Sequence, residues 1–162
     1  YEWLRDLSTN IGPRLAGSDN AAKAVKWAEQ KMKEAGADTV YLQPCMVPHW
    51  VRGEKESGSI VESNGNKTKV PVIALGNSVA TRSGGITANI IEVTDMDELP
   101  KLGKEKISGK IVFFNHPFDP KFVNTFMAYG EAVQYRWKGP SMAAKYGAVA
   151  SIVRSMTDFG VA

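Results

Sequence analysis

Two helical patterns joined by a turn rich in glycine and proline open the chain, and they constrain its fold more than any other feature. Apolar residues recur at helical spacing between Trp3 and Ile11, and a longer amphipathic helix is predicted over residues 20–35. The turn between them, residues 11–18, has the sequence Ile-Gly-Pro-Arg-Leu-Ala-Gly-Ser. Its glycines permit backbone angles closed to other residues, its proline fixes φ, and its serine can cap the following helix. Taken alone, these residues also fit an ordinary connection between two helices.

A short strand is predicted over residues 38–43, just before Pro44. Two helices and one strand leave apolar faces uncovered, so this region needs a sheet to pack against.

From residue 49 the pattern becomes β-rich. Asn64-Gly65 predicts a hairpin turn between strands at 59–62 and 70–75. The other predicted elements are strands at 86–93, 110–115 and 148–153, a short helix or turn at 95–102, and helices within 122–137 and at 140–146. The strand at 110–115 is apolar without alternation, which is typical of a strand covered on both faces. The predicted fold class is α/β (α+β), with N-terminal helices and one strand followed by a β-rich module with short crossing helices.

The composition indicates a globular chain and excludes several classes of function. Of the 162 residues, 43% are hydrophobic and 23% are charged, and the net charge is +3. The densest lysine run, between Lys101 and Lys110, is interpreted as a solvated helix end, so no nucleic-acid partner is predicted. No apolar run is long enough to span a membrane. The single cysteine, Cys45, excludes an intrachain disulfide and a cysteine-rich zinc site. Because a helical pattern begins directly at Tyr1, we expect a trimmed or mature chain.

Only two histidines, His49 and His116, are available as metal ligands or bases. Neither has a second histidine or a cysteine at metal-binding spacing, whereas zinc takes three or four ligands from clustered positions. His116 and Asp119 lie near a predicted strand end, which is a site-like position. A single histidine in a proline-flanked loop is, however, usually a hydrogen-bonded loop residue. The sequence therefore predicts no metal ligand.

Candidate nucleophiles are also incomplete. Ser141 follows Gly-Pro, as in a nucleophile elbow, but the final glycine of that motif is absent. Lys145 is four residues from Ser141, which does not match the Ser-x-x-Lys pattern. Cys45 has no basic neighbour in the sequence that would activate its thiol.

Other polar motifs are explained by local structure. Residues 66–68 have the form of a glycosylation sequon at the hairpin tip. The carboxylates Asp95, Asp97 and Glu98 fit the start of a helix, with Asp95 as its N-cap. No complete catalytic constellation emerges, and we predict no catalytic, cofactor-binding or metal-binding residue in this chain.

Several motifs together resemble the zinc exopeptidases of the co-catalytic aminopeptidase/carboxypeptidase type. The turn at 11–18 is followed by a helix that carries Trp27 and ends at Gly36. Further along lie Gly-Gly-Ile-Thr-Ala at 84–88, Ser-Gly-Lys-Ile-Val at 108–112 and Ala-Ala-Lys-Tyr-Gly-Ala at 143–148. This series is similar to the N-terminal part of such an enzyme with an inserted protease-associated (PA) domain. The likeness is greatest to the plasma glutamate carboxypeptidase-like group.

The resemblance implies two domains. Residues 1–48 would be an incomplete N-terminal segment of the peptidase domain, and residues 49–162 a PA domain whose last elements need not all be present. It also implies two zinc ions in the parent enzyme, held by residues that follow the PA insert, so that none is expected to bind to this chain. The expected partners are the rest of the peptidase domain and a peptide substrate. The expected location is secreted or periplasmic.

Three functional hypotheses remain open. The first is a non-catalytic portion of a zinc exopeptidase that hydrolyses peptide or dipeptide amide bonds, with the PA module shaping substrate access or contacts. The second is a free-standing PA-like module that binds a protein or peptide without enzymatic activity. The third is a small hydrolase that uses Ser141 or His116.

Overall fold

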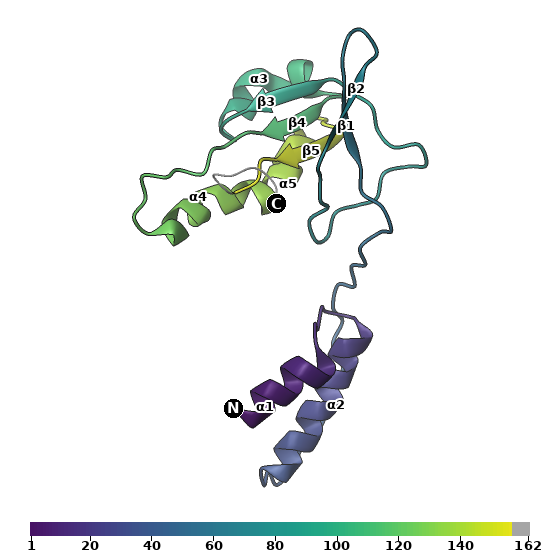
Figure 1. The fold of residues 1–162 in the computed structure, drawn as a ribbon, viewed down its shortest axis with the longest axis vertical. Helices are drawn as coiled ribbons and strands as arrows, with labels where there is room; N and C mark the ends of the chain where they lie inside the picture. Colours follow the sequence, from purple (N-terminus) through teal and green to yellow (C-terminus); the bar gives the residue numbers. More distant parts are fainter. Residues whose placement is uncertain (157–162) are drawn as a thin grey trace. The chain divides into compact units, whose positions relative to one another are not determined.

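The computed structural model describes residues 1–156, and the chain forms two compact units (Figure 1). Unit 1 contains Tyr1–Glu56 together with Gly76–Ser78, and unit 2 contains Ser57–Leu75 and the chain from Val79 onward. The assignment of residues 1–48 and 49–162 to a peptidase segment and a PA domain stays a prediction. Residues 157–162 of the predicted second domain lie outside the described residues.

Unit 1 holds the two predicted helices and the turn between them (Figure 1). Helix α1 (Glu2–Asp6) continues directly into a π-helical turn, η1 (Leu7–Ile11), and α2 spans Asp19–Glu34. Helix α2 begins at Asp19 because the Ser18 hydroxyl accepts a hydrogen bond from the Ala21 amide at 3.2 Å. Within residues 1–56 no residue is fully buried.

The predicted strand at 38–43 is wrong. These residues have no regular secondary structure. A strand is stabilised by hydrogen bonds to a neighbouring strand, and the described part of unit 1 offers no other strand as a partner. The strand-like sequence of residues 38–43 does not provide such a partner.

Unit 2 begins with the predicted hairpin. Strand β1 (Gly58–Val61) pairs antiparallel with β2 (Lys67–Val70). Gly65 in the turn has a φ of +87°, which glycine adopts without strain. The second strand lies earlier than the predicted 70–75, because Pro71 has no amide hydrogen with which to continue the ladder.

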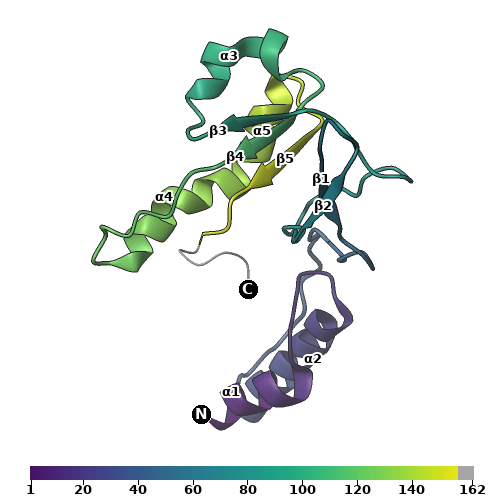
Figure 2. The same ribbon diagram turned by 45° about the horizontal axis from the view of Figure 1, so that its top comes forward.

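The second sheet of unit 2 is parallel, with the order β3-β4-β5 (Figure 2). Its four-residue strands are β3 (Ile90–Val93), β4 (Ile111–Phe114) and β5 (Ala150–Val153). Its connections hold the helices α3 (Glu98–Ile107), α4 (Thr125–Trp137) and α5 (Gly139–Lys145). The predicted α/β (α+β) class is confirmed, although several strands are shorter than predicted. None of the helices formed by residues 1–156 is long and apolar enough to cross a membrane.

The core of unit 2 lies on one face of this parallel sheet. Val93, Val112 and Phe114 are buried there. Helices α3, α4 and α5 close the same cluster with Leu99, Ile107, Tyr135 and Ala143. The alternate residues of β4, Ile111 and Phe113, are only partly buried. The prediction that this strand is covered on both faces is therefore wrong for the described residues, because all three helices pack on the same side.

Helix α3 begins later than predicted, and Asp95 is not its N-cap. The helix begins at Glu98, and Asp97 is the residue before it. Asp95 Oδ1 instead accepts a hydrogen bond from the Asp97 amide at 2.8 Å. Glu98 Oε1 accepts from the amides of Thr94 and Asp95 at 2.7 and 2.9 Å. The carboxylates of Asp95 and Glu98 thus organise the bend and turn between β3 and α3.

Candidate functional site

The turn at residues 11–18 is held by a side chain that the sequence analysis did not single out. Arg14 Nη1 donates hydrogen bonds to the backbone oxygens of Leu7 and Gly12, at 3.1 and 2.6 Å. The Leu7 carbonyl also accepts a hydrogen bond from the Gly12 amide at 3.3 Å, so Arg14 adds a second donor to it. Arg14 therefore supplies donors where η1 ends.

Gly17 and His49 form a close contact in the same unit. Gly17 has a φ of +76°, and a Cβ added to it would lie 2.7 Å from His49 Cβ. Only glycine tolerates both the backbone angle and the contact. His49 is thus a packing residue of the turn, and it is exposed to solvent on its other side.

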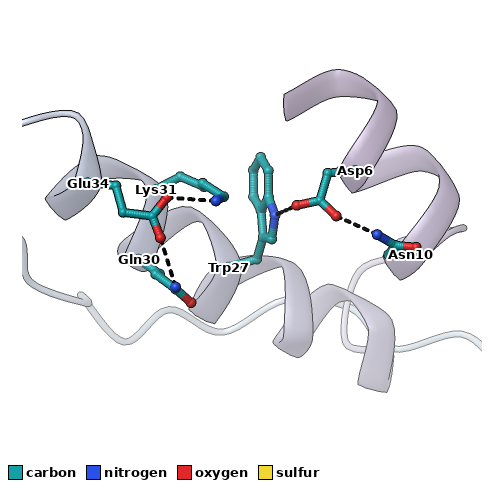
Figure 3. A network of polar contacts seen from close by, with 6 residues as sticks. All are labelled: Asp6, Asn10, Trp27, Gln30, Lys31 and Glu34. Carbon is teal, nitrogen blue, oxygen red and sulfur yellow. Dashed lines mark hydrogen bonds and ion pairs between the residues drawn. The ribbon is translucent and has the colours of Figure 1, made fainter. Parts of the chain in front are cut away.

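A network of polar contacts joins α1 to α2 (Figure 3). The Trp27 indole Nε1–H donates to Asp6 Oδ2 at 2.7 Å, and Asn10 Nδ2 donates to Asp6 Oδ1 at 2.6 Å. Both carboxylate oxygens of Asp6 are therefore used. The hydrogen bond from Trp27, and then that from Asn10, hold the pKa of Asp6 below its ordinary value.

The same network continues along α2. Lys31 Nζ lies 2.6 Å from Glu34 Oε2, and Gln30 Nε2 donates to Glu34 Oε1 at 2.8 Å (Figure 3). The hydrogen bond with Glu34 raises the pKa of Lys31, and the same bond lowers the pKa of Glu34. Every charged group of this network thus stays ionised at neutral pH and has a partner within it.

We expect the contact between α1 and α2 to weaken in acid. Because folding lowers the pKa of Asp6, its contribution to stability is present above the ordinary pKa of 3.8 and is lost as pH falls through the lower pKa of the folded state. The chemical shift of the Trp27 indole proton, followed by NMR from about pH 5 to pH 2, should report this change. The Asp6→Asn variant should lack the transition. An indole signal that stays constant in the unaltered chain would contradict the expectation.

A hollow of about 470 Å³ lies beside this network, lined by Trp3, Asp6, Thr9, Asn10, Lys31 and the ion pair of Glu2 with Arg5. Its charged groups are of both signs and all have partners: Glu2 pairs with Arg5, Lys31 with Glu34, and Asp6 accepts from Trp27. The hollow therefore presents polar surface in which the charged groups already have partners.

The most site-like cluster of unit 2 lies at the carboxyl end of the parallel sheet, where many open α/β sheets bind ligands. His116 follows β4, and its ring stacks on Tyr135 with 4.6 Å between centroids and an interplanar angle of 22°. Its Nδ1 lies 3.2 Å from the carbonyl oxygen of Thr94. Since a carbonyl only accepts, Nδ1 carries the proton in this contact and Nε2 is left as the acceptor of the neutral ring.

Tyr135 links this histidine to a carboxylate. The tyrosine is 2% exposed, and its hydroxyl donates to Asp95 Oδ2 at 3.2 Å. Burial, followed by the charge of Asp95, raises the pKa of Tyr135 from 10.0 to about 12. The hydroxyl therefore stays protonated near neutral pH, where it positions Asp95 and His116 and does not act as a base.

We expect alkaline pH to destabilise unit 2 through Tyr135. Folding raises its pKa, so its contribution to stability is complete below pH 10.0 and is lost as pH rises toward about 12. The loss in the free energy of unfolding should be on the order of 1 kcal/mol by about pH 11. Urea unfolding at about pH 9 and pH 11 measures it, with Tyr135→Phe as the variant in which this share of the pH dependence disappears. Equal pH dependence in both proteins would count against the assignment.

The other candidates from the sequence are dispersed. Asp119 accepts a hydrogen bond from a backbone amide of its own loop, so its carboxylate stabilises that loop. Ser141 and Lys145 are exposed residues of α5. Cys45 is exposed, and Asn66 of the sequon is exposed at the end of the hairpin turn. None of these residues gathers with the His116 cluster in the contacts of the described chain.

Residues 1–156 contain no group of three or more His, Cys, Asp or Glu side chains placed to hold a metal ion. Protein zinc sites need three or four such ligands in tetrahedral arrangement. The described residues therefore do not fit a zinc site.

Sequence reasoning missed Thr94, Tyr135 and Arg14. The first could have been found, because the residue after each strand of a parallel sheet lies at the same carboxyl edge. Tyr135 comes from a helix nineteen residues beyond His116 in the chain, and no local pattern predicts that the two rings stack.

Comparison with known proteins finds similarity to two solved peptidases. No family model matches the chain. A solved peptidase M28 precursor from Shewanella amazonensis superposes with a TM-score of 0.76 and 33% sequence identity, covering 96% of this chain and 34% of that one. BSAP, a zinc aminopeptidase from Bacillus subtilis, matches with a TM-score of 0.53 and 17% identity over 99% of this chain and 34% of that chain, which shows a likeness of fold alone.

The curated homologues are carboxypeptidase Q proteins. Those of Bos taurus and Homo sapiens are each 40% identical over 161 residues, which is 99% of this chain and 32% of each relative. That of Xenopus laevis is 42% identical over the same length. The chain thus spans about a third of the length of the curated relatives that it matches.

Proposed function

We propose that this chain is a non-catalytic portion of a zinc-dependent exopeptidase that hydrolyses peptide or dipeptide amide bonds. The single observation that carries the proposal is the 40% identity with carboxypeptidase Q over 99% of the chain. Residues 1–48 would belong to the peptidase domain and residues 49–162 to a PA module. That module would shape substrate access or mediate contacts.

The catalytic zinc would be held outside the described residues, which gather no ligand set. Bound zinc would activate a water molecule for attack on the amide bond. The chain described here would contribute structure: the Asp6–Trp27 contact orders the helices of unit 1, and the buried core of unit 2 supports the carboxyl edge that carries His116. The partners would be the rest of the peptidase domain and a peptide substrate, and the location would be secreted or periplasmic.

We expect the 162-residue chain to show no peptidase activity. Assayed with dipeptides and added zinc, it should give turnover indistinguishable from buffer, since its described residues provide neither a metal site nor a nucleophile–base pair. A polypeptide of the relatives' length that contains the chain should hydrolyse the same substrates, and chelation should abolish that activity. Turnover by the 162-residue chain would refute the proposal, and its loss in Ser141→Ala or His116→Ala would favour the small-hydrolase hypothesis instead.

The gene beyond residue 162 distinguishes the proposal from a free-standing binding module. A continuation that encodes a His-x-Asp pair and a Glu-Glu pair supports the peptidase. A stop codon directly after residue 162 supports a PA-like module that acts by binding alone.

A further inference from the structure

One face of the parallel sheet in unit 2 is left open by the described residues. This open face consists of Ile90, Glu92, Ile111, Phe113, Ala150 and Ile152, which the register places side by side. Ile90 is 57% exposed and Ile152 is 37% exposed, whereas Val112 and Phe114 on the opposite face are fully buried. Apart from Glu92, the open face is therefore an apolar surface, and the opposite face of the same sheet is packed in the core.

The strand sequences predict that such a face is covered. Strands with one face in water alternate apolar and polar residues, but strands of parallel sheets buried on both faces are apolar throughout. Strand β4 reads Ile-Val-Phe-Phe, and β3 begins Ile-Ile. The apolar residues of the open face thus match a buried environment better than the exposed one that they have here.

The topology explains why the helices of this unit do not provide the cover. The strands follow one another in the order β3-β4-β5, and each pair is joined by a helical crossover. Right-handed crossovers that advance in one direction place all their helices on the same face. Figure 2 shows α3, α4 and α5 in these crossovers. An element that covers the open face must therefore come from another part of the polypeptide or from another molecule.

A row of polar side chains borders the open face at the carboxyl end of the strands. Asn115 Nδ2 donates to Glu92 Oε1 at 2.6 Å, and Arg154 Nη1 donates to Asn115 Oδ1 at 3.3 Å. An apolar centre with a polar, hydrogen-bonded rim is the usual anatomy of a protein interface. The exposed Arg154 at the end of the row would suit a carboxylate on the covering element.

We propose that the open face is the docking surface for a segment of the same polypeptide, drawn from the two thirds of the relatives' length that have no counterpart in this chain. The proposal rests on the proposed function, because it requires a longer protein. The segment would present apolar side chains to Ile90, Phe113 and Ile152 and an acidic side chain to Arg154. A tethered segment acts at a high effective concentration, so it occupies the face ahead of a second copy of the chain.

Thiol labelling tests this proposal. With Cys45 replaced by serine, a single cysteine is introduced by Ile152→Cys on the open face, by Ile90→Cys as a second reporter, or by Lys101→Cys on the exposed surface of α3 as the control. Each variant is made in the 162-residue chain and in the full-length protein, and circular dichroism verifies that it folds. Labelling rates are then measured at several protein concentrations.

In the full-length protein, we expect the open-face cysteines to label at least about tenfold more slowly than the control, as for a site that must open locally to react. In the 162-residue chain they should label as fast as the control. Equal rates in the full-length protein would overturn the proposal. Slow labelling in the 162-residue chain would also overturn it, and a dependence on protein concentration would identify a second copy as the occupant.

Peptidase activity of the full-length protein is measured separately, so that the two proposals can fail independently. Slow labelling in an inactive full-length protein would reject the proposed function and keep the docking surface. Fast labelling in an active full-length protein would reject the docking surface and keep the proposed function.

Discussion

Replacing Phe114 by alanine is expected to lower the free energy of unfolding of unit 2 by about 3–5 kcal/mol. Phe114 lies on the central strand, is fully buried, and has its ring 5.7 Å from that of Tyr135. Truncation removes a large apolar side chain and leaves a cavity that the surrounding sheet and helices cannot close fully. Urea unfolding followed by far-ultraviolet circular dichroism measures the loss.

The matched control for this truncation is Phe126→Ala. Phe126 lies in the first turn of α4, is 76% exposed, and has its ring 5.7 Å from that of Tyr129. Its removal should change the free energy of unfolding by about 0.5 kcal/mol or less, as for most surface substitutions. Similar losses for the two phenylalanines would show that Phe114 is not at the centre of the core.

Replacing Gly139 by alanine is expected to destabilise unit 2 by roughly 1–3 kcal/mol. Gly139 is the first residue of α5, and a Cβ placed on it would lie 2.9 Å from Cε2 and 3.1 Å from Cδ2 of Phe114. The Phe114 ring is buried and cannot move aside without displacing its neighbours. The added methyl group therefore overpacks the boundary between β4 and α5.

Two variants separate this steric effect from a general effect of removing glycine. Gly130 lies within α4, and a Cβ on it would meet nothing within 4 Å. Gly130→Ala should therefore stabilise the protein, by roughly 0.5–1 kcal/mol, because alanine restricts the unfolded chain. Combining Gly139→Ala with Phe114→Leu should cost less than the sum of the two single changes, since the shorter side chain leaves room for the methyl group. If the changes in the free energy of unfolding of the two single variants summed to that of the double variant, the steric explanation would be ruled out.

The elements that could be predicted from the sequence are those whose determinants lie close together in the chain. Ser18 fixes the start of α2, and Gly65 fixes the turn of the hairpin. Apolar runs predict the strands at 110–115 and 148–153, and the β-forming residues after Gly84-Gly85 predict the strand that ends at Val93. In each case a few consecutive residues decide the backbone conformation.

The elements that could not be predicted depend on partners far away in the chain. Residues 38–43 have a strand-like sequence, but a strand forms only where another strand pairs with it. Whether both faces of β4 are buried depends on the side of the sheet on which the crossover helices pack. In the candidate site, the position of His116 near a strand end was predicted. Its stacking on Tyr135 and the link to Asp95 arise from the packing of α4 against the sheet.

The hairpin of unit 2 bears on how this protein behaves at high concentration. Within the described residues β1 and β2 form a sheet of two strands, so each strand leaves an outer edge that could pair with another molecule. Each strand has only four residues, Lys67 and Lys69 charge β2, and Pro71 follows directly after it. Short length, lysine and proline all oppose the edge-to-edge growth that leads to fibrils. The hairpin can therefore be presented to solvent without seeding aggregation.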